Sequence, residues 1–179
     1  MNSNHPSTND DERARTHIEH HPVHSVHPVQ TNTIGPFTKP DLLAALDLQR
    51  AKFRFLIAEA APDATHDALA HEIAKGARRD LIVSTVELIT EYCLTTDQTR
   101  TYHAQPWYQF ARVLRNSVLH YRGEFVSRWP RALSEKGITE LRWRHLVLRD
   151  HIGEMVRLAN DDAVAFWEEL RAFAERDLR

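Results

Sequence analysis

The sequence predicts an all-α bundle of about five helices behind a disordered N-terminal tail. Glycine and proline are few, with 5 and 8 among the 179 residues, and the apolar residues recur at three- and four-residue spacing while strand-type alternation is scarce. The chain is long enough to bury one core, and 42% hydrophobic with 27% charged residues is typical of soluble globular proteins. We therefore expect a single helical domain over residues 34–179.

Residues 1–33 form a polar segment that we expect to be disordered, because its composition cannot bury enough apolar surface to offset the entropy of ordering. Imidazole is a common ligand for zinc, nickel or copper. However, no cysteine or clear carboxylate framework joins the histidines of this tail, and its prolines would break a helix that aligns them. We expect adventitious binding of purification metals here, with a physiological metal site as the weaker alternative. The histidines with ligand-like spacing are His17, His20, His21, His24 and His27.

The first helix is predicted from Lys39 to about Ala60. Thr38 is a candidate N-cap, and a proline and an acidic residue follow it in the first turn. Residues 61–63 end this helix, and Asp63 is expected to cap the next segment, which carries Leu69 and Ile73. The residues expected on the buried side of the first helix are Leu42, Leu43, Leu46, Phe53, Leu56 and Ile57.

A central core helix is predicted from Ala77 to Leu94, with Gly76 breaking or weakening the helical segment that precedes it. Cys93 is expected to be a small buried hydrophobe, with a nucleophile as the weaker alternative, because nothing beside it would depress the pKa of its thiol. Residues 95–105 are predicted to be a polar link. The apolar surface of the core helix comprises Leu81, Ile82, Thr85, Val86, Leu88, Ile89 and Tyr92.

Residues 106–122 are predicted to form one amphipathic helix, which Gly123 ends. At about 100° per residue, its apolar side chains fall in a stripe of the width that a core-facing helix needs. The opposite face carries Arg112, Asn116 and His120 in one row, and Arg115 at the edge of the stripe can reach that row. The apolar stripe comprises Trp107, Phe110, Ala111, Leu114, Val118 and Tyr121.

The segment from Glu124 to Trp143 is predicted to be irregular or to contain a small hairpin, held to the bundle by Trp129 and Trp143. A further helix is predicted from Arg144, and the run 160–162 is expected to cap a final helix. The apolar residues assigned to the first of these helices are Leu146, Val147, Ile152, Met155, Val156 and Leu158. Those assigned to the final helix are Val164, Phe166, Trp167, Leu170 and Phe173.

Positive charge is concentrated in one part of the chain. Residues 100–149 hold ten Lys or Arg against three Glu, a balance of +7, although the whole chain has a net charge of -2. Nine of the ten are arginine, whose planar fork pairs with phosphate through two hydrogen bonds. A polyanionic partner is one interpretation, and a solvated face of intramolecular ion pairs is the other.

The run Arg115-Asn116 followed by His120, near the end of a helix, resembles the Arg, polar residue, spacer and His signature of HEPN domains. The resemblance covers roughly residues 38–178, and its specific part runs from Arg115 to Trp129, with Gly123 and the later tryptophan similar to a bacterial and plasmid-borne branch. It implies a small helical bundle, usually dimeric, in which two copies of the motif come together. Many members are metal-independent RNases of toxin, phage-defence or RNA-processing systems.

The residue types suit RNA cleavage without a metal or cofactor. A histidine near neutral pKa can transfer protons, and an arginine can stabilise the charge of the phosphorane. We therefore assign Arg115, Asn116 and His120 as candidate catalytic residues, in a site shared between the two subunits of a homodimer. The candidate RNA-binding residues are Arg112, Arg122, Arg128 and Arg131.

Two alternatives accompany this interpretation. A non-catalytic HEPN-like module that binds RNA or protein would have the same motif, since family resemblance alone does not establish catalysis. A second Arg-polar-spacer-His pattern, Arg144-His145 with His151, has the looser spacing, but it is predicted to open a helix instead of closing one.

The expected location is cytoplasmic. No stretch approaches the roughly 20 apolar residues that span a bilayer, so no membrane partner is predicted. The amino terminus lacks the apolar core of a secretion signal. RNA, a second copy of the chain, and an antitoxin or regulatory protein are the expected partners.

Overall fold

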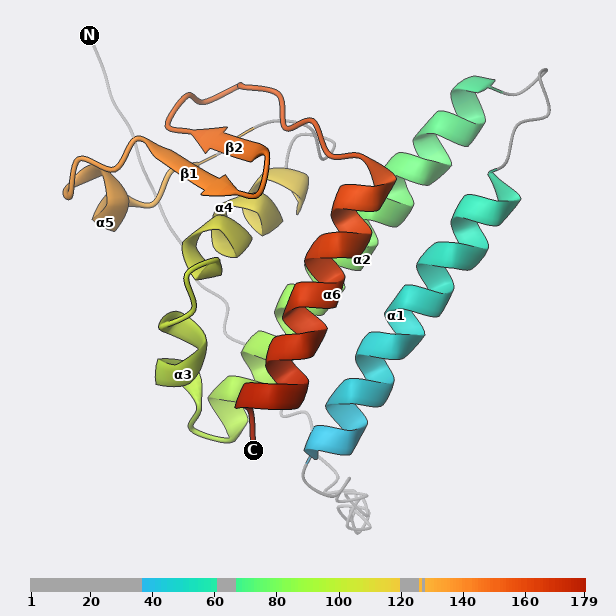
Figure 1. The fold of residues 1–179 in the computed structure, drawn as a ribbon. Helices are drawn as coiled ribbons and strands as arrows, with labels where there is room; N and C mark the ends of the chain where they lie inside the picture. Colours follow the sequence, from blue (N-terminus) through green and yellow to red (C-terminus); the bar gives the residue numbers. More distant parts are fainter. Residues whose placement is uncertain (1–36, 61–66, 120–125, 127) are drawn as a thin grey trace, which may run out of the picture. The chain divides into compact units, whose positions relative to one another are not determined.

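The computed structural model describes residues 37–60, 67–119, 126 and 128–179. Within these ranges the chain is mostly helical, with a small two-stranded antiparallel sheet (Figure 1). The all-α prediction is therefore confirmed for the described residues, whereas the predicted tail and Asp63 lie outside them. In chain order the elements are α1 (Lys39–Glu59), α2 (Asp67–Thr95), α3 (Thr99–His103), α4 (Tyr108–Leu119), α5 (Arg131–Ser134), β1 (Glu140–Trp143), β2 (Leu146–Arg149) and α6 (Asn160–Asp177).

Helix α1 begins at a reciprocal N-terminal cap. The backbone N–H of Asp41 donates to Thr38 Oγ1 at 3.4 Å, and the backbone N–H of Thr38 donates to the Asp41 carboxylate at 2.9 Å. Hydrogen bonds from the Thr38 side chain and backbone hold the pKa of Asp41 below its ordinary value. Pro40 lies in the first turn, where its missing N–H leaves no gap in the hydrogen bonding. The predicted start of this helix is confirmed.

Helix α2 is the element against which most others pack, since it contacts α1, α3, α4 and α6. The predicted core helix is confirmed, but it extends without interruption through Gly76 back to Asp67. Of the two alternatives for Gly76, the break is wrong: a glycine inside a helix costs only about 1 kcal/mol, which tertiary packing offsets. The buried residues of α2 are Ala77, Leu81, Ile82, Thr85, Val86, Ile89, Tyr92 and Cys93.

The polar link predicted over residues 95–105 is wrong in its middle, where the short helix α3 forms. Tyr102 of α3 is only 2% exposed, and its ring lies 5.8 Å from that of Trp107 and 5.0 Å from that of Tyr108. The buried side chain of Gln98 accepts a hydrogen bond from the backbone N–H of Arg179 at 2.8 Å. Contacts with distant residues therefore hold this segment in place, and the polar composition of residues 95–105 alone does not predict these contacts.

The helix predicted from Arg144 is also wrong, because Leu146–Arg149 is strand β2. It pairs antiparallel with β1 so that Trp143 lies opposite Leu146. Leu146 and Leu148 are buried while their neighbours are more exposed, which is the two-residue period of a strand. A run of four residues is too short for periodicity to separate strand from helix. Residues 150–159 form no helix either, and Ile152 is 68% exposed.

Helix α6 closes the bundle and contacts both α1 and α2. Its N-terminus is capped by Asp162, whose carboxylate accepts from the backbone N–H of Ala159 at 3.0 Å, while Asn160 instead accepts from the guanidinium of Arg78 at 2.8 Å. The Trp167 indole donates to the carbonyl of Leu46 on α1 at 3.0 Å. The predicted capping run is thus confirmed, with Asp162 as the residue that caps.

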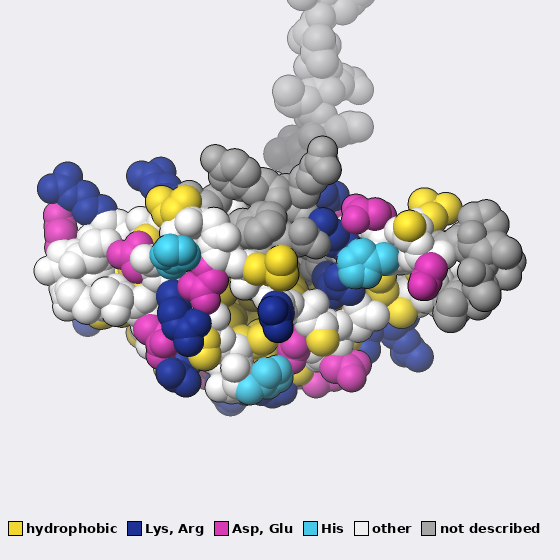
Figure 2. Space-filling view, turned by 90° about the horizontal axis from the view of Figure 1, so that it is seen from above, with side chains coloured by type: hydrophobic (Ala, Val, Ile, Leu, Met, Phe, Trp, Pro, Cys, Tyr) yellow, Lys and Arg dark blue, Asp and Glu magenta, His cyan; other side chains and the backbone are white. Residues whose placement is uncertain are grey.

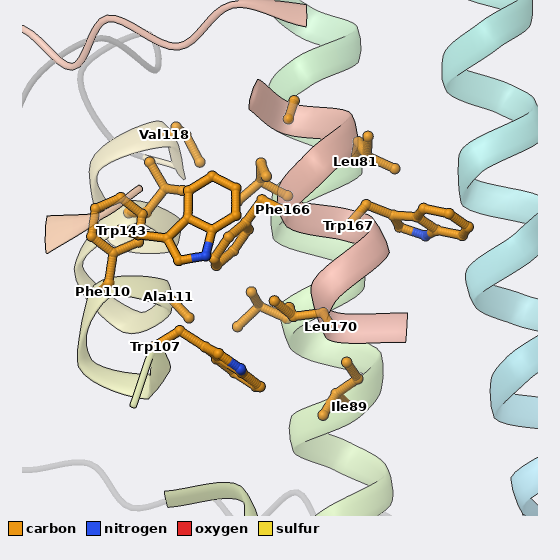
Figure 3. Packing of buried hydrophobic residues seen from close by; sticks show 14 of the residues in the cluster. Leu81, Ile89, Trp107, Phe110, Ala111, Val118, Trp143, Phe166, Trp167 and Leu170 are labelled. Carbon is orange, nitrogen blue, oxygen red and sulfur yellow. The ribbon is translucent and has the colours of Figure 1, made fainter. Parts of the chain in front are cut away.

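Aromatic side chains join the hairpin to the helices. The Trp143 ring lies 4.9 Å from that of Phe166 on α6 and 6.0 Å from that of Phe110 on α4 (Figure 3). The Trp143 indole also donates to Glu169 at 2.7 Å, and the Trp129 indole donates to the carbonyl of Ile138 at 2.9 Å. Both tryptophans are over nine-tenths buried, so the prediction that they hold this segment on the bundle is confirmed.

We expect Phe166→Ala to lower the free energy of unfolding by about 3–5 kcal/mol, because the ring is fully buried at the junction of α4, α6 and β1. Ile152→Ala is the matched control, since its side chain is largely exposed and its loss should cost less than about 0.5 kcal/mol. Urea denaturation followed by circular dichroism measures both. Equal midpoints for the two variants would contradict the packing described.

Candidate functional site

Helix α4 has the predicted division into a buried and a polar face. The helix begins at Tyr108, two residues later than predicted, and residues 120–122 lie outside the described ranges. Trp107, just before the helix, and Phe110, Ala111, Leu114 and Val118 within it are all buried, as expected. The buried face is wider than predicted, because it also includes Val113 and Ser117. The Ser117 hydroxyl donates to the carbonyl of Val113 at 2.8 Å. It therefore serves the helix and is no candidate nucleophile.

Three of the predicted site residues share one cavity. Arg112, Arg115 and Asn116 of α4 face a hollow of about 560 Å³ between α4 and the second half of α2. Arg112 is exposed, whereas Arg115 and Asn116 are half-buried. The predicted convergence of cationic and amide groups is thus observed for these three. The other lining residues are Val86, Glu87, Thr90, Glu91, Tyr102 and Tyr108.

The guanidinium of Arg115 has two partners within the chain. It donates to the side-chain oxygen of Asn116 at 3.0 Å, and it forms an ion pair and hydrogen bond with Glu87 across the cavity. Glu91 lines the same cavity. A phosphate entering here would therefore compete with a carboxylate for Arg115, while Arg112 has no hydrogen bond or ion pair among the described residues. Glu87 was absent from the sequence prediction, because it precedes Arg115 by 28 residues.

Aromatic side chains form another wall of this cavity. Tyr108 lies 4.3 Å from the ring of His103, in a tilted stack, and 5.0 Å from the ring of Tyr102. Burial raises the pKa of Tyr102 to about 12, so its hydroxyl stays protonated at neutral pH. The hydroxyl of Thr90 lies 3.4 Å from that of Tyr102. The cavity thus combines guanidinium groups, which can pair with phosphates, and aromatic rings, on which bases can stack.

The remaining predicted residues divide into two groups. His120 and Arg122 lie outside the described residues. Arg128 is exposed, and Arg131 on α5 pairs with Glu135 at 2.7 Å. Neither Arg128 nor Arg131 lines the cavity of Arg115.

Much of the positive charge predicted to attract a polyanion is paired within the chain. Besides Arg115, Arg142 pairs with Glu140 at 2.5 Å, and Arg149 pairs with Glu140 and with Glu154 at 3.2 and 2.8 Å. For the hairpin, these pairs favour the alternative interpretation, in which ion pairs within the chain neutralise the positive charge. Arg100, Arg112, Arg128 and Arg144 make no such pair among the described residues, so their charge stays available.

The second Arg-polar-spacer-His pattern does not form a site. Arg144 occupies the two-residue turn of the hairpin with a φ of 50°, and its guanidinium lies 4.7 Å from the centre of the Trp143 ring. His145 pairs with Asp162 at 3.0 Å, and His151 is exposed in the following loop. The prediction that this pattern opens a helix is wrong. The three side chains have different surroundings, which agrees with the preference for Arg115 and His120 as the candidate site.

A second cavity, which the sequence interpretation missed, is lined by many basic side chains together with two acidic ones, Glu154 and Asp162. It measures about 820 Å³ and lies between the first half of α2, the hairpin and the segment before α6. Figure 2 shows the face at the top of Figure 1, where dark blue basic and cyan histidine side chains are interspersed with acidic ones. The signal that could have revealed this lining is the spacing of His71, Lys75 and Arg79 along one side of α2. The charged and histidine residues that line the cavity are His71, Lys75, Arg78, Arg79, His145, Arg149, Glu154, Arg157 and Asp162.

Neither a metal centre nor a membrane span is present in the part of the chain that the structure describes. No group of three or more His, Cys, Asp or Glu is arranged there to hold an ion. No helix in that part is long and apolar enough to cross a bilayer. Comparisons with protein-family models, curated proteins and solved structures found no match.

Cys93 is a buried hydrophobe, as predicted, with a fully covered side chain and a pKa that burial raises to about 11. Because the thiolate is the reactive form, we expect a disulfide reagent at about pH 8 to modify the folded protein at a rate on the order of 10²-fold slower than the urea-unfolded chain. Absorbance of the released thiol group measures both rates. Comparable rates would show that the side chain is accessible.

Proposed function

We propose that this protein is a metal-independent endoribonuclease of the HEPN type, with a site shared between two copies of the chain. The observation that supports the proposal is the cavity beside α4, which Arg112, Arg115 and Asn116 line together with Tyr102 and Tyr108. A guanidinium suits a phosphate, and an aromatic ring suits an unpaired base. Single-stranded or loop RNA is the substrate class that offers both.

The proposed reaction is attack of a ribose 2′-oxygen on the adjacent phosphorus. A base removes the 2′-hydroxyl proton, the new P–O bond forms, the bond to the 5′-oxygen breaks, and an acid protonates that oxygen. His120 is proposed for proton transfer, and Arg115 is proposed to stabilise the negative charge of the phosphorane. The products are a 2′,3′-cyclic phosphate and a free 5′-hydroxyl. Asn116, which already bonds to Arg115, is proposed to orient the guanidinium.

Two protonation roles call for two groups, and the motif supplies one histidine per chain. A two-fold contact between the polar faces of two α4 helices would bring two histidines and two arginines to one cleft. This is why the proposal includes a homodimer. A toxin or phage-defence role, with an antitoxin or regulatory protein as partner, is the biological setting that we propose from the same resemblance.

A non-catalytic binding module is the second candidate, and one observation favours it. Glu87 engages Arg115 across the cavity, and Glu91 adds a second carboxylate to the wall. These acids oppose the charge that would otherwise attract RNA. The module would bind RNA through phosphate contacts, with an affinity that falls steeply with salt and without product formation.

Cleavage of mixed cellular RNA in the presence of a chelator tests the proposal. We expect the parent protein to cleave, and His120→Ala and Arg115→Ala each to reduce the rate by about 10²–10⁴-fold, because a proton-transfer group or the charge on the phosphorane is lost. Gel electrophoresis measures the rates, and end-group analysis should find 2′,3′-cyclic phosphate.

The matched controls are His151→Ala and Arg100→Ala, an exposed histidine and an exposed arginine that line no part of the candidate cavity. Both should retain nearly full activity, and all four variants should keep the helical circular dichroism of the parent. An inactive parent, or a His120→Ala variant as active as the parent, would exclude the nuclease and leave the binding module.

Glu87→Gln tests the competition at Arg115. Removing the carboxylate charge should tighten binding of a single-stranded RNA oligonucleotide to the His120→Ala background by up to about fivefold, since a partly exposed ion pair is worth up to about 1 kcal/mol. Fluorescence anisotropy at fixed salt measures the affinity. Glu135→Gln, which removes the partner of Arg131 instead, is the control and should change it less.

A further inference from the structure

The outward face of α1 is apolar where a surface helix should be charged. At about 100° per residue, this face lies opposite the buried Leu42, Leu46 and Phe53 of the same helix. Leu48 is 66% exposed and Phe55 is 63% exposed. We call this face the outer stripe, and all of its residues are exposed: Ala44, Leu48, Ala51, Phe55 and Ala58.

The spacing within the outer stripe is that of a coiled-coil seam. Its residues follow one another at intervals of four, three, four and three, which is the alternation of the a and d positions of a heptad. Leu48 and Phe55 fall at equivalent a positions, and the alanines fall at d. Small residues at d let two helices approach closely, while the large ones supply the area to be buried. Two exposed apolar side chains one heptad apart are thus placed for a partner helix.

We infer that the outer stripe binds the outer stripe of a second copy of this chain, with the two α1 helices parallel. The flanking charges specify this partner. In a parallel pair, a residue at position g meets the residue five places later on the other helix, which joins Asp47 to Lys52 and Arg54 to Glu59. Both pairs have opposite signs, and two-fold symmetry repeats each of them.

The antiparallel arrangement is less complementary. It can place Asp47 of one copy beside Arg54 of the other, but Lys52 and Glu59 then meet no opposite charge across the seam, whereas the parallel pair gives both of them one. Arg54 and Glu59 have no hydrogen bond or ion pair among the described residues, so their charges are available to a partner. Asp47 and Lys52 are already engaged, with Arg171 at 2.6 Å and with Asp80 at 3.5 Å, and they contribute less.

This interface is separate from the proposed RNase site. The outer stripe lies on α1 and the candidate cavity lies between α2 and α4, with no residue in common. If the proposed α4 contact also forms, the assembly has two kinds of interface and is at least a tetramer; otherwise it is a dimer. A variant that disrupts the α1 contact therefore leaves the α4 contact intact, and the reverse also holds, so each can be measured separately.

Light scattering of the full chain at micromolar concentration tests the inference. The double variant Leu48→Glu/Phe55→Glu should have half the molar mass of the parent, with unchanged helical circular dichroism, because four like charges cannot occupy one seam. Leu94→Glu/Ile152→Glu, which changes two equally exposed apolar residues elsewhere, should keep the parental mass. A double variant with the parental mass would overturn the inference alone, whereas a monomeric parent would overturn both the inference and the α4 contact of the proposed RNase.

Cysteine cross-linking tests the orientation. In the parallel pair, position 44 lies beside position 44 and position 58 beside position 58, so Ala44→Cys and Ala58→Cys should each form a disulfide-linked dimer alone under mild oxidation. Cys93 is buried and does not interfere. Leu94→Cys is the exposed control and should remain reduced. A cross-link that forms only when the two alanine variants are mixed would show an antiparallel pair and overturn the parallel assignment.

Discussion

The contact of Trp143 with Phe110 and Phe166 is the interaction on which the arrangement of the bundle depends. It joins the hairpin, α4 and α6, three parts that are separated in the sequence, through rings 4.9–6.0 Å apart. The indole N–H is not left unpaired, because Glu169 accepts its hydrogen bond. Burial of these aromatic rings thus fixes the rotation of α4 about its own axis. The hydrogen bond to Glu169 avoids the free-energy cost of burying the indole N–H without a partner.

That rotation determines which side chains of α4 reach α2. With Phe110, Leu114 and Val118 turned inward, the polar side of α4 is directed toward Glu87 and the cavity. The core and the candidate site therefore use opposite sides of one helix. Side chains of the site can be changed without opening the core, which is what allows chemical and structural roles to be separated by mutation.

Helix α1 shows how one element can carry two apolar surfaces of different purpose. Its inner face packs on α2 and α6, and its outer stripe is exposed. Two apolar faces on opposite sides leave little contrast around the helix, so amphipathicity alone identifies only the first. The charged residues that flank the outer stripe form complementary pairs only when a second helix packs against it.

Local signals were sufficient to predict α1, the core part of α2, α4 and α6. Their caps and three- to four-residue periodicity act within one or two helical turns, so neighbouring residues contain the whole signal. The same signals placed Arg112, Arg115 and Asn116 together, because positions three and four apart on a helix are neighbours.

The tertiary structure alone revealed helix α3, the hairpin, the position of Glu87 and the second cavity. Tyr102 is held by Trp107 and by the distant Phe173, β2 by its pairing with β1, and Arg115 by a carboxylate 28 residues earlier. In each of these cases the stabilising partner is remote or the segment is too short to carry a period, and no local pattern specifies which residues will meet.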